Sequence, residues 1–163
     1  MDSDEVVRRL HKAYGVLAKQ DLQLLELDAN ERSITHKLAE HLQVEFHEWH
    51  VDCEYNRDGG QPKRVHLAYS VPADDTDAVT VFPDIVVHHR DTQDNLLVIE
   101  AKKSSSVQQS QDEEKLAAYV ADLGYRYAFK IVFPIGDLAD GAIAERDIVE
   151  FEPHSGAPLG GNP

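Results

Sequence analysis

The fold of this chain is indicated by two apolar stretches that end in charged residues, Phe82-Pro83-Asp84-Ile85-Val86-Val87 and Leu96-Leu97-Val98-Ile99-Glu100-Ala101-Lys102. Alternation with a period of two places Asp84 on one face of the first strand, and Glu100 with Lys102 on one face of the second. The polar residues 90–95 between them predict a hairpin connection, which places Asp84 opposite or diagonal to Glu100. Two carboxylates and an ammonium group are therefore expected at one place on the sheet.

Such a cluster of like charges requires a cation, because burying carboxylates side by side costs on the order of several kcal/mol. Aspartate and glutamate oxygens suit Mg²⁺ or Mn²⁺. A nearby lysine can orient a water molecule or offset charge on a phosphate. The pattern therefore makes Asp84 and Glu100 candidate metal ligands and Lys102 a candidate catalytic residue. A buried structural ion pair is the alternative interpretation of these three residues.

The spacing of Pro83-Asp84 and Glu100-Ala101-Lys102, with fifteen residues between the carboxylates, resembles the PD-(D/E)xK nuclease superfamily. The stretches 30–36 and 51–57 are similar to those of small, uncharacterised prokaryotic members, so the resemblance covers about residues 28–133. It implies a restriction-endonuclease-like core with the order α-β-β-β-α-β. It also implies metal binding by Asp84, Glu100 and the Ala101 carbonyl, and hydrolysis of phosphodiester bonds in nucleic acid, with DNA as the expected substrate.

Glu31 is a further candidate, because positions 31, 34, 38 and 42 share one helical face and Glu31 lies at the head of the apolar stripe. Some members of the resembled superfamily carry a metal-site glutamate on the helix before the sheet. The resemblance therefore implies that Glu31 is a metal ligand and a catalytic residue. The alternative is a capping box, in which Asp28 is the N-cap and Glu31 reaches back to it.

Two residues of the following helix, Lys115 and Tyr119, are four positions apart and therefore share a face. One branch of the superfamily, the RecB type, carries Gln-x-x-x-Tyr at this place, and the present chain has lysine instead of glutamine. The resemblance implies substrate binding by Lys115 and Tyr119. The alternative is that Tyr119 belongs to the core and that Lys115 is solvated.

Periodicity, caps and turn residues predict the remaining elements. We expect helices over 4–27, 31–43 and 108–123, strands over 49–56, 125–133 and 147–151, and a short strand over 64–71 within the long connection 57–80. This order predicts an α/β fold with a central mixed β-sheet flanked by helices. We expect a single nuclease-like domain over 1–152 and a flexible tail, rich in glycine and proline, over 153–163.

Composition narrows the setting in which the protein works. The 163 residues, 42% of them hydrophobic, suit one domain with a real core. No run approaches the ~20 apolar residues needed to cross a bilayer, and the first residues are acidic where a signal peptide would be basic. The single cysteine excludes an intramolecular disulfide framework. A cytoplasmic protein without membrane association is therefore expected.

Net charge is the main observation against avid binding of nucleic acid. The chain has 16 basic and 30 acidic residues, a net charge of −14, and phosphate contacts dominate the affinity of most DNA-binding proteins. Metal ions and a local basic patch can partly compensate. We therefore expect nucleic acid as the partner, with a homodimer as a further candidate assembly. The alternative function is a non-catalytic binding or regulatory module that keeps the nuclease-like fold.

Overall fold

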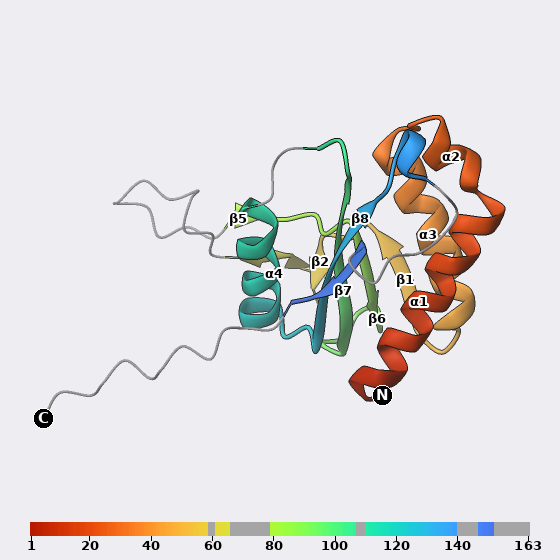
Figure 1. The fold of residues 1–163 in the computed structure, drawn as a ribbon. Helices are drawn as coiled ribbons and strands as arrows, with labels where there is room; N and C mark the ends of the chain where they lie inside the picture. Colours follow the sequence, from red (N-terminus) through yellow and green to blue (C-terminus); the bar gives the residue numbers. More distant parts are fainter. Residues whose placement is uncertain (59–60, 66–78, 107–109, 140–146, 152–163) are drawn as a thin grey trace, which may run out of the picture.

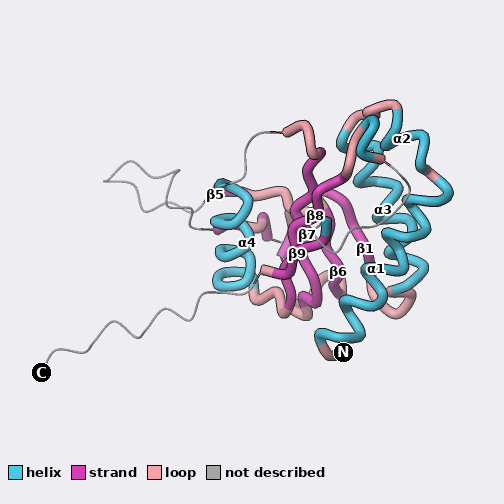
Figure 2. Tube along the Cα trace, viewed as in Figure 1, coloured by secondary structure: helices cyan, strands magenta, loops and turns pink. Residues whose placement is uncertain are grey.

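The computed structural model describes residues 1–58, 61–65, 79–106, 110–139 and 147–151. Within these residues the chain forms an α/β fold in which helices cover both faces of a central sheet (Figures 1 and 2). The tail expected at 153–163 lies outside the described residues. Among the described residues, no helix is both long enough and apolar enough to cross a membrane.

The N-terminal segment up to Glu45 is helical, as predicted, but the first helix is shorter than expected. Helix α1 spans Ser3–Gln20, and its N-cap is Asp2, whose carboxylate accepts a hydrogen bond from the Glu5 N–H at 2.9 Å. A separate helix α2 spans Leu22–Glu26, so the predicted helix 4–27 is divided at Asp21. The Asp21 carboxylate lies 2.7 Å from His41 Nε2 on the next helix. This tertiary contact accompanies the break, and periodicity within the segment does not reveal it.

Helix α3 spans Glu31–Glu45, and its apolar stripe of Ile34, Leu38 and Leu42 is buried as expected. Its N-cap is Asn30, whose side chain accepts a hydrogen bond from the Arg32 N–H at 2.9 Å. Glu31 is thus the first residue of the helix, and the capping box with Asp28 as N-cap is wrong.

The central sheet has five strands and is mixed, as predicted. Its spatial order is β1 (His50–Cys53), β6 (Ile85–His88), β7 (Asn95–Lys103), β8 (Tyr127–Phe133) and β9 (Ile148–Glu150). The β7–β8 pair is parallel, and the other three pairs are antiparallel. A parallel pair needs a crossover connection, which here contains helix α4, Ser110–Leu123. Gly124 follows α4 with φ +67°, the left-handed conformation expected of a residue that ends a helix.

Two short pairs complete the described strands: β2 (Arg57–Asp58) with β3 (Gln61–Pro62), and β4 (Arg64–Val65) with β5 (Val79–Thr80). The strand predicted over 64–71 is therefore present at its first two residues, and the rest lies outside the described residues. A 3-10 turn, η2 (Gly136–Leu138), follows β8.

The core lies on both faces of the sheet. Helices α1 and α3 cover one face and α4 covers the other (Figure 1). Because neighbouring strand residues point to opposite faces, Ile99 packs toward α1 and α3, whereas Val98 packs with Leu116 and Tyr119 of α4. The two helical layers hold β7 between them, and most of this strand is buried.

The predicted hairpin is present, although β6 starts later than expected. It begins at Ile85, so Phe82 and Asp84 precede the strand instead of lying in it. The register shifts between Val87 and His88, and Leu96 consequently packs with the opposite cluster from Val98. Continuing the pairing of Ile85 with Ile99 by one residue places Asp84 opposite Glu100, as predicted.

Candidate metal-binding site

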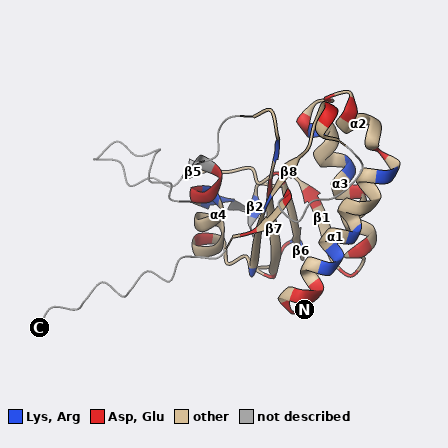
Figure 3. Ribbon diagram, viewed as in Figure 1, with Lys and Arg blue, Asp and Glu red and all other residues tan. Residues whose placement is uncertain are grey.

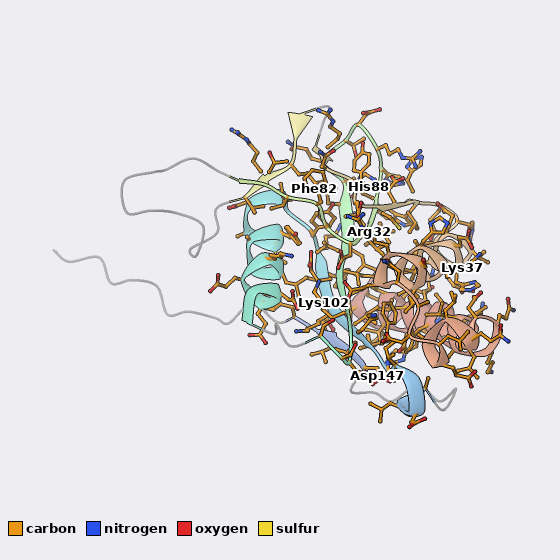
Figure 4. The ribbon with its side chains drawn as sticks, turned by 90° about the horizontal axis from the view of Figure 1, so that it is seen from above. Arg32, Lys37, Phe82, His88, Lys102 and Asp147 are labelled. Atoms are coloured by element: carbon orange, nitrogen blue, oxygen red, sulfur yellow. The ribbon has the colours of Figure 1, made fainter. Side chains whose placement is uncertain are left out.

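The candidate site lies where β6 begins, β7 ends and α3 starts. Figure 4 views this region from above and labels Lys102 of β7 and Arg32 of α3. The Asp84 carboxylate accepts a hydrogen bond from the Ala101 N–H through Oδ2, at 2.8 Å. Its other oxygen accepts none from the described residues. One carboxylate oxygen is therefore available to a ligand.

Backbone geometry brings the Ala101 carbonyl to the same side as Asp84. The pairing of β7 with β6 ends at Ile99, whereas its pairing with β8 continues to Lys103. In a strand, the N–H and C=O groups of one residue point to the same side, as antiparallel pairs that exchange both bonds show. Since the Ala101 N–H points to Asp84, its carbonyl faces the same side. This geometry supports the predicted role of that carbonyl as a ligand.

Glu100 is the most deeply buried charged group of the site, with 1% of its surface exposed. Its carboxylate accepts hydrogen bonds from the Tyr119 hydroxyl, at 3.0 Å, and from Lys115 Nζ, at 3.1 Å. Burial, together with the charge of Asp84, raises the pKa of Glu100 to about 7, although Lys115 and Tyr119 oppose the shift. The two carboxylates are therefore close enough to repel each other, which supports the clustering predicted from the sequence.

The pKa of Asp84 is shifted in the same direction as that of Glu100. Burial raises the pKa of Asp84, and the charge of Glu31 adds to the effect, while the Ala101 N–H, Lys102 and Lys115 oppose it. Both carboxyl groups thus lie in an environment that favours their neutral form. A bound cation would reverse this preference.

Lys102 points to α3 and not to Glu100. Its Nζ lies 3.6 Å from Glu31 Oε1, and the second oxygen of Glu31 accepts a hydrogen bond from the Lys103 N–H at 3.1 Å. The cation that pairs with Glu100 is Lys115. The alternative of one buried ion pair formed by Asp84, Glu100 and Lys102 therefore has the wrong cation, and Lys102 lies at the edge of the site, partly open to solvent.

Lys115 and Tyr119 do share a helical face, but both side chains donate hydrogen bonds to Glu100. Tyr119 is fully buried, in agreement with the alternative that it belongs to the core, and its substrate contact stays a prediction. Lys115 is only partly buried, beside the carboxylate, and its substrate contact stays a prediction. Sequence spacing indicated that the two residues act together, and the sheet decides what they bind.

A pocket of about 320 Å³ opens in front of Asp84. It is lined by Glu31, Arg32, Thr35, Cys53, Glu54 and Asp84. Glu54 has φ +48°, directly after β1, and its N–H donates to the Asp84 carbonyl at 3.2 Å. This left-handed turn follows the end of β1 at Cys53, and Glu54 is one of the residues that line the pocket. Cys53, the last residue of β1, is exposed.

The donor set suits a hard divalent cation only in part. Carboxylate oxygens of Asp84 and Glu100 and a backbone carbonyl are the ligands that Mg²⁺ and Mn²⁺ prefer. Within the described ranges, however, no three His, Cys, Asp or Glu side chains converge into a ready ligand set. Glu31 is held by Lys102 and the backbone of Lys103, so its role as a third carboxylate ligand stays a prediction.

The raised pKa of Glu100 predicts how stability depends on pH. A carboxyl with a folded pKa of about 7, above its ordinary 4.5, stabilises the fold fully at low pH, and this contribution is lost as the pH rises through about 7. Glu100→Gln stays neutral and should gain stability relative to the wild type over this range, by on the order of 3 kcal/mol. Urea unfolding of both proteins at several pH values measures the difference. If the difference in unfolding free energy between the two proteins did not change with pH, the raised pKa of Glu100 would be contradicted.

Comparison with protein-family models, with curated proteins and with solved structures finds no match to this chain. The class of protein must therefore be inferred from the chemistry of the site itself.

Proposed function

We propose that this protein is a Mg²⁺- or Mn²⁺-dependent nuclease with a restriction-endonuclease-like core, and that it hydrolyses phosphodiester bonds in DNA. The observation that carries the proposal is the placement of Asp84 opposite the buried Glu100, with Lys102 at the same end of β7. The order α3, β1, β6, β7, α4, β8 supports it, because this is the order that the superfamily resemblance implies.

Asp84, Glu100 and the Ala101 carbonyl would hold the metal ion. When bound, the ion would supply positive charge at the scissile phosphate and lower the pKa of a water molecule. Lys102 is close to Asp84 and partly open to solvent, so its ammonium group can orient a water molecule or bind a phosphate oxygen. Glu31 restrains that ammonium through their ion pair and acts as a positioning residue as well as a candidate ligand.

Lys115 and Tyr119 position Glu100. Each binds one oxygen of its carboxylate, and the two come from successive turns of α4. The ammonium of Lys115 offsets the charge of the carboxylate pair when no metal is bound. A metal ion that binds Glu100 would have to share or displace this contact.

This same contact favours the second candidate function, a non-catalytic binding or regulatory module. The buried Glu100 already has a cation and a hydroxyl as partners, so the fold tolerates it without metal. The net charge of −14 agrees with this candidate. The two functions differ in a simple observation, because only a nuclease converts its substrate.

The test is an incubation of the purified chain with end-labelled single-stranded DNA, duplex DNA and RNA, in Mn²⁺, in Mg²⁺ and in EDTA. We expect fragments with the divalent metal ions and none with EDTA. The binding module would be supported instead if the protein, as a monomer or a dimer, binds the metal ion and leaves all three substrates intact. Sedimentation in the same buffers tests the expected homodimer.

A further inference from the structure

We propose that the substrate of this site is single-stranded, with an unpaired base stacked on Phe82 and a neighbouring phosphate bound by Arg32. The inference rests on the proposed nuclease function and names its substrate class. It follows from Arg32, which lines the pocket, and from Phe82, which precedes the pocket residue Asp84 by two positions. In Figure 4 the labels Phe82, Arg32 and Lys102 mark three different segments at this end of the sheet: the segment before β6, helix α3 and strand β7.

Phe82 presents an aromatic ring to solvent from a well-anchored backbone. Of the large hydrophobic side chains exposed within the described residues, it is the only aromatic one, with 55% of its surface exposed. Its two neighbours, Val81 and Pro83, are buried, and the Val81 N–H donates to the Lys63 carbonyl at 3.1 Å. The ring is therefore held outward by a fixed chain, as a stacking platform requires.

Phe82 belongs to the same segment before β6 as Asp84, a residue of the candidate metal site. Phe82 and Asp84 are two positions apart, so at most about 7 Å of extended backbone separates them. A base on this ring and a phosphate at Asp84 can thus belong to the same or adjacent nucleotides. In a duplex, the base would be paired and stacked within the helix and could not reach the ring.

Arg32 supplies a phosphate contact at the pocket itself. It lines the pocket together with Asp84, and 83% of its side chain is exposed. Its Nε lies 2.9 Å from Glu54 Oε1, so the guanidinium group lies beside another residue of the pocket lining. The two NH₂ groups have no partner among the described residues, and guanidinium groups bind phosphate oxygens through such paired donors.

The charge of the molecule favours the same substrate class. Acidic residues are distributed over the helices and mixed with the basic ones (Figure 3), and the net charge is −14. Duplex binding depends mainly on many phosphate contacts, which such a surface opposes. Single strands are bound through stacking as well, and each stacked base raises affinity roughly tenfold. A few local contacts around one pocket are therefore sufficient for a single strand.

The test compares Phe82→Ala with Phe82→Trp, and uses Val44→Ala as the matched control. Val44 is an exposed apolar residue near the C-terminal end of α3, far from the site at its N-terminus. Fluorescence anisotropy with labelled oligothymidylate and with a duplex of equal length, both in EDTA, measures binding without cleavage. We expect wild type, Phe82→Trp and Val44→Ala to prefer the single strand, and Phe82→Ala to bind it roughly tenfold more weakly. Arg32→Ala should weaken it as well.

The outcomes separate this inference from the proposed function. Equal or tighter binding of the duplex, or a Phe82→Ala variant that behaves like Val44→Ala, overturns the inference. If such a protein still cleaves duplex DNA with Mn²⁺, the nuclease function stands. Conversely, oligothymidylate binding that depends on Phe82, in a protein that cleaves no nucleic acid, supports the stacking site and overturns the nuclease function.

Discussion

Lys102→Ala should reduce metal-dependent cleavage of DNA by a factor of about 10³, while the protein folds as before. Loss of one preorganised contact to the charge that develops in the transition state costs about this much. The folded state should lose little, because the Lys102 side chain is partly exposed and its contact with Glu31 is a long ion pair at 3.6 Å. Initial cleavage rates and the melting temperature are the two measurements.

The matched control for this variant is Lys37→Ala. Lys37 lies on the exposed side of α3 and pairs with Glu40 of the same helix, so it also loses one ion pair. The Lys37→Ala variant should cleave DNA at the wild-type rate. Equal rates for wild type and Lys102→Ala would show that cleavage comes from another site or from another protein in the preparation.

Asp84→Asn should abolish the stabilisation of the protein by Mn²⁺. A ligand at one hundred times its Kd stabilises the folded state by about 2.7 kcal/mol, which corresponds to a rise of roughly 5–10 °C in the melting temperature of a domain of this size. The amide removes the charge that attracts the ion but keeps an oxygen to accept the Ala101 N–H. Without metal, the variant should be at least as stable as the wild type, because the charge of Asp84 no longer acts on Glu100.

The control for charge is Asp91→Asn. Asp91 is exposed in the connection between β6 and β7, and its φ of +59° suits asparagine equally well. This variant should keep the full Mn²⁺ response. Titration calorimetry of the wild type that shows no heat with millimolar Mn²⁺, together with an unchanged melting temperature, would rule out the metal site.

Local patterns were sufficient to predict the elements around the site. Alternation and the polar connection predicted the hairpin, and its register places Asp84 opposite Glu100. The periodicity of α3 correctly placed Glu31 at the head of a buried stripe, close to the end of β7. These predictions succeeded because strand alternation, helix periodicity and turn residues act over a few neighbouring positions.

The partners of the charged groups could not be predicted in this way. The division of the first helix at Asp21 accompanies a contact with His41, and the ion pair of Glu100 joins β7 to α4. The start of β6 at Ile85 also moved Phe82 out of the strand and into solvent. Each of these depends on residues that are distant in the sequence or on where strand pairing ends.

The sequence by itself determined which chemistry is present: two carboxylates and a lysine at the ends of paired strands, in an α/β fold. Only the tertiary structure decided that Lys115 is the cation for Glu100, that Lys102 turns to Glu31, and that Arg32 and Glu54 border the pocket. The physical reason is that a buried charge must find its partner within a few ångströms. Which groups meet at that distance is set by how the helices pack on the sheet.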